Sequence, residues 1–320
     1  MRDQADELRQ LVRQRLAEHS EPIDDRSAAR APTSSIGDAH WQSQWHTEEH
    51  QWHANGRTSA GFRKIVVSAG KGGVGATTVA VNLAISLAAA GCRTILVDAD
   101  LSGADATLLC GLESSESIGD VLSGRRTMHE ILQTGPGGIQ VVPGIWSPST
   151  VPDCSPSGQQ RLRRQLDQLG RHADWVILDA GSGLNHVVRR FWQMADEVLL
   201  VTTGEAAAIM DTYAAIKLFL GELPRAAVQT AVNQSHSEAE SAAVHVRLEA
   251  AARRFLGMTL THAGSVPWDA AVALAATEGK PLAYGHASAP AAKAIERIAE
   301  RLLAARNAAT RHAVREFVVD

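Results

Sequence analysis

A glycine-rich stretch at residues 70–77, GKGGVGAT, constrains the fold more than any other feature of the sequence. It follows the apolar run KIVVSA (64–69) and precedes TTVAVNLAISLAAAG (77–91), whose apolar residues recur at helical spacing. Glycines let backbone N–H groups turn toward an anion, and the helix N-terminus adds positive partial charge. The stretch therefore predicts a phosphate-binding loop, except that Ala76 stands where the pattern G-x-x-x-x-G-K-[ST] has lysine.

The rest of the chain alternates short apolar runs with helical patterns. The further candidate strands are 94–100, 139–144, 174–181, 197–203, 227–234 and 260–267. Unbroken apolar strands between helices are typical of a mostly parallel sheet with helices on both faces. We expect an α/β fold of the P-loop NTPase class, with its ligand at the carboxyl ends of the strands.

The sequence predicts four segments. Residues 1–19 form an amphipathic helix, residues 20–61 a flexible linker, residues 62–290 the nucleotide-binding domain, and residues 291–320 a C-terminal helix and tail. The linker is rich in His and Trp, as in HWQSQWHTEEHQWH (40–53). A solvated tail and a weak metal or partner patch are both compatible with that composition.

The net charge and the cysteines indicate which partners and which cellular compartment the sequence favours. A net charge of −4 counts against nucleic acid as the main partner, since no overall positive field would recruit it. Cys92, Cys110 and Cys154 follow no metal-binding or disulfide spacing, as in proteins of a reducing compartment. The polar N-terminus and the lack of a long apolar run predict a cytoplasmic protein.

The alanine at position 76 bears directly on activity. A lysine ammonium there would bind the β- and γ-phosphates, and a hydrogen bond to a charged group contributes about 1.5–3 kcal/mol. Backbone donors and Mg²⁺ would still hold a nucleotide. The charge that develops during hydrolysis would, however, lose a fixed cation. Whether ATP is hydrolysed stays open on the sequence alone.

KGGVGATT (71–78) resembles the deviant phosphate loop of the MinD/ParA ATPases, K-G-G-x-G-K-[ST], which belong to the SIMIBI class. The resemblance implies that ATP or ADP contacts Gly70, Lys71, Gly72, Gly73, Val74, Gly75, Ala76, Thr77 and Thr78. In this family the leading lysine, here Lys71, reaches across an ATP-bound homodimer to the partner's phosphates. Lys71 is therefore a candidate catalytic residue.

Two further segments resemble the family's switch regions. In ILVDADLSGADATLLCGL (95–112) the resemblance places Asp98 near Mg²⁺ and gives Asp100 the role of positioning the attacking water. In DWVILDAGSGL (174–184) it places Asp179 beside the same metal, with Thr77 as a ligand. Two positions depart from the family pattern: Asp105 replaces an asparagine and Thr107 replaces an aspartate. Acids in simple turns, or one capping a helix, are the alternative.

The resemblance also implies a binding site for the base and ribose. It assigns Asn233 to adenine, and Pro267 and Asp269 to the surroundings of the base and ribose. Single Asn and Asp residues often have only local structural roles, so that interpretation stays open.

DQADELR (3–9) resembles the N-terminal D-Q-A-x-x-L-R motif of the FlhG branch of the family, also called FleN or YlxH. The resemblance implies that this helix stimulates an FlhF-type GTPase and that the branch limits flagellar number or placement. The residues implied in partner binding are Asp3, Gln4, Ala5, Leu8 and Arg9. Flagellar C-ring proteins or a transcription regulator are further implied partners. Docking of this helix on its own domain is the alternative.

The C-terminal tail has a small apolar face, formed by Ala313, Val314, Phe317 and Val318. The resemblance implies a helix that contacts the anionic inner face of the cell membrane. The shortness of the tail and its acidic residues, Glu316 and Asp320, favour ordinary packing instead. Both interpretations stay open.

The sequence thus predicts an ATP-dependent dimerisation switch whose hydrolysis is weakened at Ala76. A scaffold of the same fold, without turnover, is the main alternative. A ParA-type partitioning ATPase that binds DNA is the third, and both the acidic balance and the N-terminal motif count against it.

Overall fold

The structure is a computed structural model that describes residues 62–101, 103–146, 155–220 and 227–317. The predicted N-terminal helix with its partner-binding residues (Asp3, Gln4, Ala5, Leu8 and Arg9), the linker 20–61 and the side chains of the predicted C-terminal apolar face lie outside the described residues. They stay predictions.

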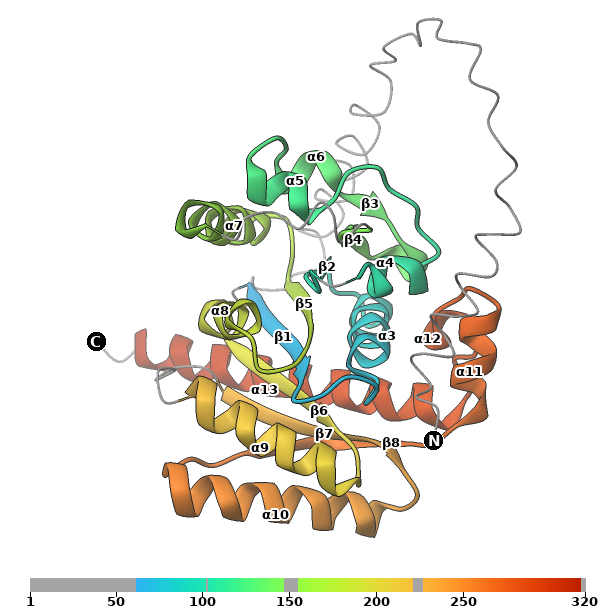
Figure 1. Cartoon of the computed structure of the whole chain (residues 1–320), viewed down its shortest axis with the longest axis vertical. Helices are drawn as coiled ribbons and strands as arrows, with labels where there is room; N and C mark the ends of the chain where they lie inside the picture. Colours follow the sequence, from blue (N-terminus) through green and yellow to red (C-terminus); the bar gives the residue numbers. More distant parts are fainter. Residues whose placement is uncertain (1–61, 102, 147–154, 221–226, 318–320) are drawn as a thin grey trace, which may run out of the picture.

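A single sheet of eight strands forms the centre of the described part, in the order β3-β4-β2-β5-β1-β6-β7-β8. The strands are β1 (Arg63–Ala69), β2 (Thr94–Asp98), β3 (Gln133–Thr134), β4 (Gln140–Val142), β5 (Trp175–Ser182), β6 (Glu197–Thr202), β7 (Ala227–Ser235) and β8 (Thr261–Pro267). All neighbours are parallel except β3 and β4. The predicted fold class is therefore confirmed (Figure 1).

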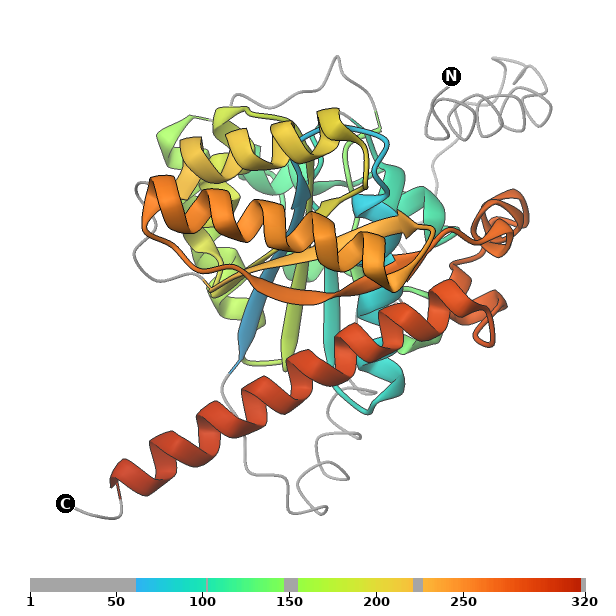
Figure 2. The ribbon, with the colours of Figure 1, turned by 90° about the horizontal axis from the view of Figure 1, so that it is seen from below.

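Helices connect the strands and cover both faces of the sheet (Figure 1). They are α3 (Ala76–Ala89), α4 (Asp105–Leu109), α5 (Ile118–Ser123), α6 (Met128–Ile131), α7 (Pro156–Leu169), α8 (His186–Met194), α9 (Ala206–Leu220), α10 (Glu238–Leu256), α11 (Ala270–Thr277), α12 (Leu282–Gly285) and α13 (Pro290–Phe317). Figure 2 shows α13 on one side of the sheet and α9 and α10 on the other.

Two apolar cores result from the alternation of side chains along the strands. In β1, Ile65 and Val67 face the core beneath α3 and α13, whereas Val66 faces the core beneath the helices α5–α10. All three side chains are fully buried. Burial on both faces explains why β1 is an unbroken apolar run in the sequence.

The helix α13 is both part of the core and an extension from it. Ile295, Ile298 and Leu302 recur at helical spacing and are buried in the core shared with α3. The C-terminal half of the helix projects beyond the sheet in Figure 2. In the described part of the chain, none of the helices has the length and apolar character needed to span a bilayer.

Candidate nucleotide-binding site

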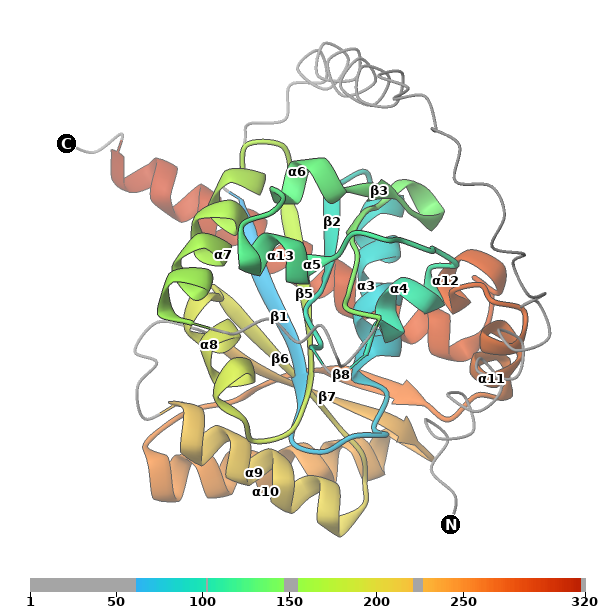
Figure 3. The ribbon, with the colours of Figure 1, turned by 45° about the horizontal axis from the view of Figure 1, so that its top comes forward.

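A cavity of about 280 Å³ opens at the carboxyl ends of the central strands, between the glycine-rich loop, α4 and α11. Figure 3 shows α11 and α12 beside α4 and α3. The lining includes all of residues 71–78 and also Asp100, Asn233, Pro267 and Asp269. Four segments that are separated in the sequence, and whose residues were predicted to bind one nucleotide, therefore border one cavity.

The backbone of the loop requires glycine at particular positions. Gly73 and Gly75 have φ of 83° and 85°, a region that residues with a side chain rarely occupy. Gly70 lies against the backbone of α9, where an added Cβ would stand 2.3 Å from the carbonyl carbon of Asp211. The loop is thus held against α9 on one side and shaped by two left-handed glycines on the other.

The N-terminus of α3 is open toward the cavity. Its N-cap is Gly75, which supplies no side-chain acceptor, and its first turn contains no acidic residue. The first N–H groups of a helix have no partner within the helix, and together with the helix dipole they attract an anion. In combination with the curled loop, this arrangement can bind a phosphate chain.

Two buried carboxylates lie directly behind the loop. Asp98 at the end of β2 pairs in register with Asp179 of β5, and both side chains are fully buried. Burial raises the pKa of Asp98 well above its usual value, and the charge of Asp179 raises it further. Burial also raises the pKa of Asp179, to about 7, although a hydrogen bond with the Thr77 side chain opposes the shift.

The carboxylate of Asp100 lies against the backbone near the end of β5, at Gly181. A Cβ on Gly181 would lie 2.3 Å from a carboxylate oxygen of Asp100, and Gly181 has a φ of 67°. Only glycine therefore fits at position 181. Gly181 was not among the predicted site residues, although its place two residues after Asp179 is a signal visible in the sequence.

The three residues predicted to hold Mg²⁺ fit a hard cation. Asp98 and Asp179 each keep one buried oxygen, Oδ1 and Oδ2 respectively, that has no hydrogen-bond partner among the described residues. Thr77 lies at the same place, since its side chain hydrogen-bonds with Asp179. Mg²⁺ is commonly bound by one or two carboxylates together with substrate phosphates, so this incomplete set suits it. Such an ion would offset the negative charges of these carboxylates and of a bound phosphate chain.

Lys71 is held by an acid of its own chain. Its Nζ lies 3.2 Å from Oε2 of Glu205, which follows β6. Both side chains are partly exposed, at 34% and 66%. An ion pair this exposed contributes at most about 1 kcal/mol, so Lys71 can be released at little cost. Glu205 was not predicted as a site residue, because no local sequence pattern links it to the loop.

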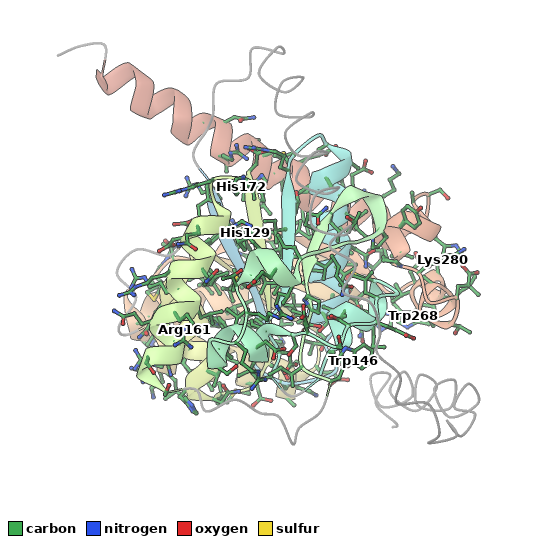
Figure 4. All side chains as sticks on the ribbon, turned by 90° about the horizontal axis from the view of Figure 1, so that it is seen from above. His129, Trp146, Arg161, His172, Trp268 and Lys280 are labelled. Carbon is green, nitrogen blue, oxygen red and sulfur yellow. The ribbon has the colours of Figure 1, made fainter. Side chains whose placement is uncertain are left out.

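Ala76 lines the cavity and is also part of the core beneath α3, where it is 8% exposed. Among the residues that line the cavity, the lysines are Lys71 and Lys280. In the described part of the chain, position 76 itself therefore supplies no cation to the cavity. Figure 4 shows Lys280 and Trp268 on the same side of the molecule, near α11.

The residues predicted to bind the base and ribose have structural contacts as well. The side-chain amide of Asn233 donates to the carbonyl of Val74 (2.8 Å), so it braces the loop. Asp269 accepts from the backbone N–H of Ala271 (2.9 Å) and of Ala291 (3.0 Å), and it thereby ties α11 to α13. Trp268 is 55% exposed at the rim of the cavity.

Comparison with known proteins places this geometry in a family. A family model described as an AAA domain matches residues 62–219. Antiactivator FleN of Pseudomonas aeruginosa is 32% identical over 238 residues, which cover 74% of this chain and 85% of the relative. This chain belongs to the FleN family of MinD/ParA-type ATPases. Flagellum site-determining protein YlxH of Helicobacter pylori is 31% identical over 156 residues, 48% of this chain and 52% of the relative.

Solved structures share the fold of the FleN-family chain. The cell division ATPase MinD of Pyrococcus furiosus superimposes with a TM-score of 0.65 at 23% identity, over 75% of this chain and 98% of MinD. The septum site-determining protein MinD of Pyrococcus horikoshii, solved with Mg-ADP, gives 0.65 at 22% identity over 75% and 96%. At this identity the likeness shows the fold alone.

Proposed function

We propose that the protein is an ATP-dependent dimerisation switch that regulates flagellar number or placement. The observation that carries the proposal is the open N-terminus of α3, which faces the buried pair Asp98 and Asp179 across the side chain of Thr77. Backbone N–H groups on one side and unsatisfied carboxylate oxygens on the other suit a phosphate chain with its Mg²⁺. The flagellar role is supported by the relative YlxH, which is named a flagellum site-determining protein.

In this proposal, each group of residues around the cavity has a separate role. The loop 70–78 binds the phosphates, and Asn233, Pro267 and Asp269, which line the cavity, surround the base and ribose. Thr77, Asp98 and Asp179 hold Mg²⁺ behind the loop. Asp100 orients the attacking water. Lys71 leaves Glu205 and reaches the phosphates of the partner subunit, which couples ATP binding to dimer formation. With Ala76 in place of lysine, hydrolysis is slow.

We further propose that residues 3–9 act on an FlhF-type GTPase. The support is the DQADELR sequence at the N-terminus of a FleN-family chain. In this proposal, a flagellar C-ring protein or a transcription regulator is a second partner of the switch. The protein is located in the cytoplasm and contacts the inner membrane surface through its C-terminal tail.

The direct test is isothermal titration of the full chain with ATP and with ADP, each with Mg²⁺, followed by light scattering. We expect binding of both nucleotides and a dimer only with ATP. No heat at millimolar nucleotide would overturn the switch. The partner role is tested separately: residues 1–20 as a peptide should stimulate an FlhF-type GTPase, and the Gln4→Ala peptide should not.

A nucleotide-independent scaffold is the second candidate, and the observation in its favour is Ala76 itself, which removes the cation that supports turnover. It predicts partner binding of equal strength with and without ATP. The third candidate, a ParA-type ATPase, predicts salt-sensitive binding of random duplex DNA when ATP is present.

A further inference from the structure

A groove rich in arginine lies between α7 and the turn that joins α5 to α6. It encloses about 560 Å³ and is lined by Arg125, Arg126, Arg161 and Arg164, with Glu130 as the acidic residue in the lining. None of its lining residues lines the nucleotide cavity. Figure 4 shows Arg161 on the opposite side of the molecule from Lys280. We call this feature the arginine groove.

Two of the four arginines are already neutralised by nearby acids. Arg125 pairs with Asp120 and Arg126 with Glu116, each at 2.7 Å. Glu130 accepts from the backbone N–H of Thr127 (2.6 Å) and from its hydroxyl (2.9 Å), which fixes its carboxylate at the start of α6.

The other two arginines keep their charge. The Nη1 of Arg161 donates to the carbonyl of Leu122 (2.8 Å), a bond that orients the guanidinium without cancelling it. Arg164 is exposed on the same helix. Within the described residues, no carboxylate forms an ion pair with either side chain. Arginine presents a planar fork of donors that matches a carboxylate, so the groove suits an acidic peptide.

The N-terminal part of the chain joins the domain close to this groove. Phe62 lies against Gly170, where an added Cβ would stand 2.4 Å from the ring, and Gly170 directly follows α7. At 1.5 Å per helical residue, six residues along α7 separate Gly170 from Arg164 by about 9 Å. Whatever precedes Phe62 therefore starts beside the groove.

An acidic segment precedes Phe62 at a suitable separation. EHSEPIDD (18–25) contains Glu18, Glu21, Asp24 and Asp25 and no Lys or Arg. The linker that the sequence predicts between this segment and Phe62 would have a root-mean-square span of roughly 30–36 Å, which is enough to return along α7. Tethering also gives the segment an effective concentration on the order of millimolar at the groove.

We propose that residues 18–25 bind in the arginine groove of the same chain, with their carboxylates on Arg161 and Arg164. Bound in this way, the segment holds the preceding DQADELR motif beside α7, and its release makes the motif available to a partner. That consequence rests on the proposed function, whereas the docking itself does not. The proposed ligand of the arginine groove is thus the acidic segment 18–25 of the same chain.

The test is carboxyl-to-amine crosslinking with a zero-length reagent in the full chain. Arg164→Lys places an amine in the groove and keeps its charge. Arg163→Lys is the matched control, since Arg163 is the exposed neighbour on α7 that does not line the groove. Circular dichroism verifies that both variants fold, and mass spectrometry identifies the linked peptides. The experiment requires neither nucleotide nor GTPase, so its failure is distinguishable from failure of the switch.

We expect links from position 164 to residues 18–25 in at least tenfold higher yield than from position 163. A salt concentration of 0.5 M should reduce the yield from position 164 to the control level, because it screens the ion pairs between the segment and the groove. Equal yields at the two positions would overturn the proposal. So would links from position 164 mainly to Glu48 and Glu49, or links between ¹⁵N-labelled and unlabelled chains, which would indicate another segment or a second copy.

Discussion

Thr107 donates both its backbone N–H (2.9 Å) and its hydroxyl (2.6 Å) to the same carboxylate oxygen of Asp98. The hydroxyl oxygen also accepts the N–H of Gly144 (2.8 Å). One side chain therefore joins the end of β2 to α4 and to the loop after β4. Position 107 departs from the family pattern, and the departure has a physical reason: an aspartate there would place a second carboxylate against buried Asp98 and could not donate when ionised.

Removal of this hydroxyl should destabilise the protein. In Thr107→Val, a buried oxygen of Asp98 loses its strongest donor and Gly144 loses its acceptor, which costs about 1–3 kcal/mol in the free energy of unfolding. Urea denaturation measures the change, and Thr107→Ser is the control that keeps both bonds. Equal stability of the valine variant and the wild type would show that the link between these three segments is dispensable.

Gly75 and Gly72 offer a matched pair in the loop. Gly75→Ala should abolish nucleotide binding or destabilise the loop, because φ is 85° and the new Cβ would stand 2.3 Å from the Asn233 amide nitrogen. Gly72→Ala meets only the Ser182 hydroxyl at 3.5 Å, an ordinary contact, and should retain binding. Titration with Mg-ADP compares the two. A similar loss of Mg-ADP affinity in both variants would mean that binding depends on the flexibility of the loop and not on its left-handed backbone at Gly75.

Ala76→Lys should restore the missing cation. The side chain borders the cavity, so a lysine there can extend toward the phosphates. We expect roughly 10- to 100-fold tighter ATP binding, from about 1.5–3 kcal/mol for a charged hydrogen bond, and a rise in slow ATP turnover. Phosphate release measures the rate, and Ala76→Met controls for side-chain size. A wild type that already hydrolyses ATP at the rate of the lysine variant would show that Lys71 suffices.

Breaking the ion pair between Lys71 and Glu205 should change ATP binding but leave the stability of the fold nearly unchanged. Glu205→Gln frees Lys71, so ATP should bind about two- to fivefold more tightly and dimers should form at lower ATP, since an exposed pair contributes at most about 1 kcal/mol. For the same reason the melting temperature should hardly change. Calorimetry and light scattering test this, with Lys71→Ala as the opposite case. Unchanged affinity in Glu205→Gln would mean that the lysine does not serve the nucleotide.

Local patterns in the sequence predicted most of the sheet but not its edge. β1, β2 and β5–β8 are apolar runs that the sequence marks directly, as is the shorter β4. β3 consists of Gln133 and Thr134 alone, pairs antiparallel to β4, and is too short to produce a pattern. A strand of two residues forms only because it pairs with a neighbouring strand, here β4.

The candidate site shows the same division. A motif can indicate the residues at strand ends, such as Asp98 and Asp179, because parallel strands bring their carboxyl ends together. Contacts between distant segments leave no such trace. The distance of 134 positions between Lys71 and Glu205, and the second task of Asn233 as a brace on Val74, follow only from the packed structure.

A stacked pair of histidines predicts sensitivity to acid. The rings of His245 on α10 and His262 on β8 stack with centroids 4.8 Å apart, and Nδ1 of His245 lies 2.7 Å from the Thr230 hydroxyl. Burial lowers the pKa of His245, and the charge of His262 lowers it further. Burial lowers the pKa of His262 as well, with the charge of Arg301 as the next cause.

The sign of the effect follows from these shifts. Each folded-state pKa lies below the unfolded value of about 6.5, so the unfolded chain binds more protons as the pH falls. The stability that the neutral pair provides is complete above pH 6.5 and is lost as the pH drops through the folded pKa values. His262→Gln keeps a polar group near Ser241 but cannot be charged, so its free energy of unfolding should decline less between pH 7 and 5 than that of the wild type. Urea denaturation across this range measures the difference, and NMR titration of the histidine ring protons assigns it. Parallel curves for the two proteins would show that the stack titrates alike in the folded and unfolded chains.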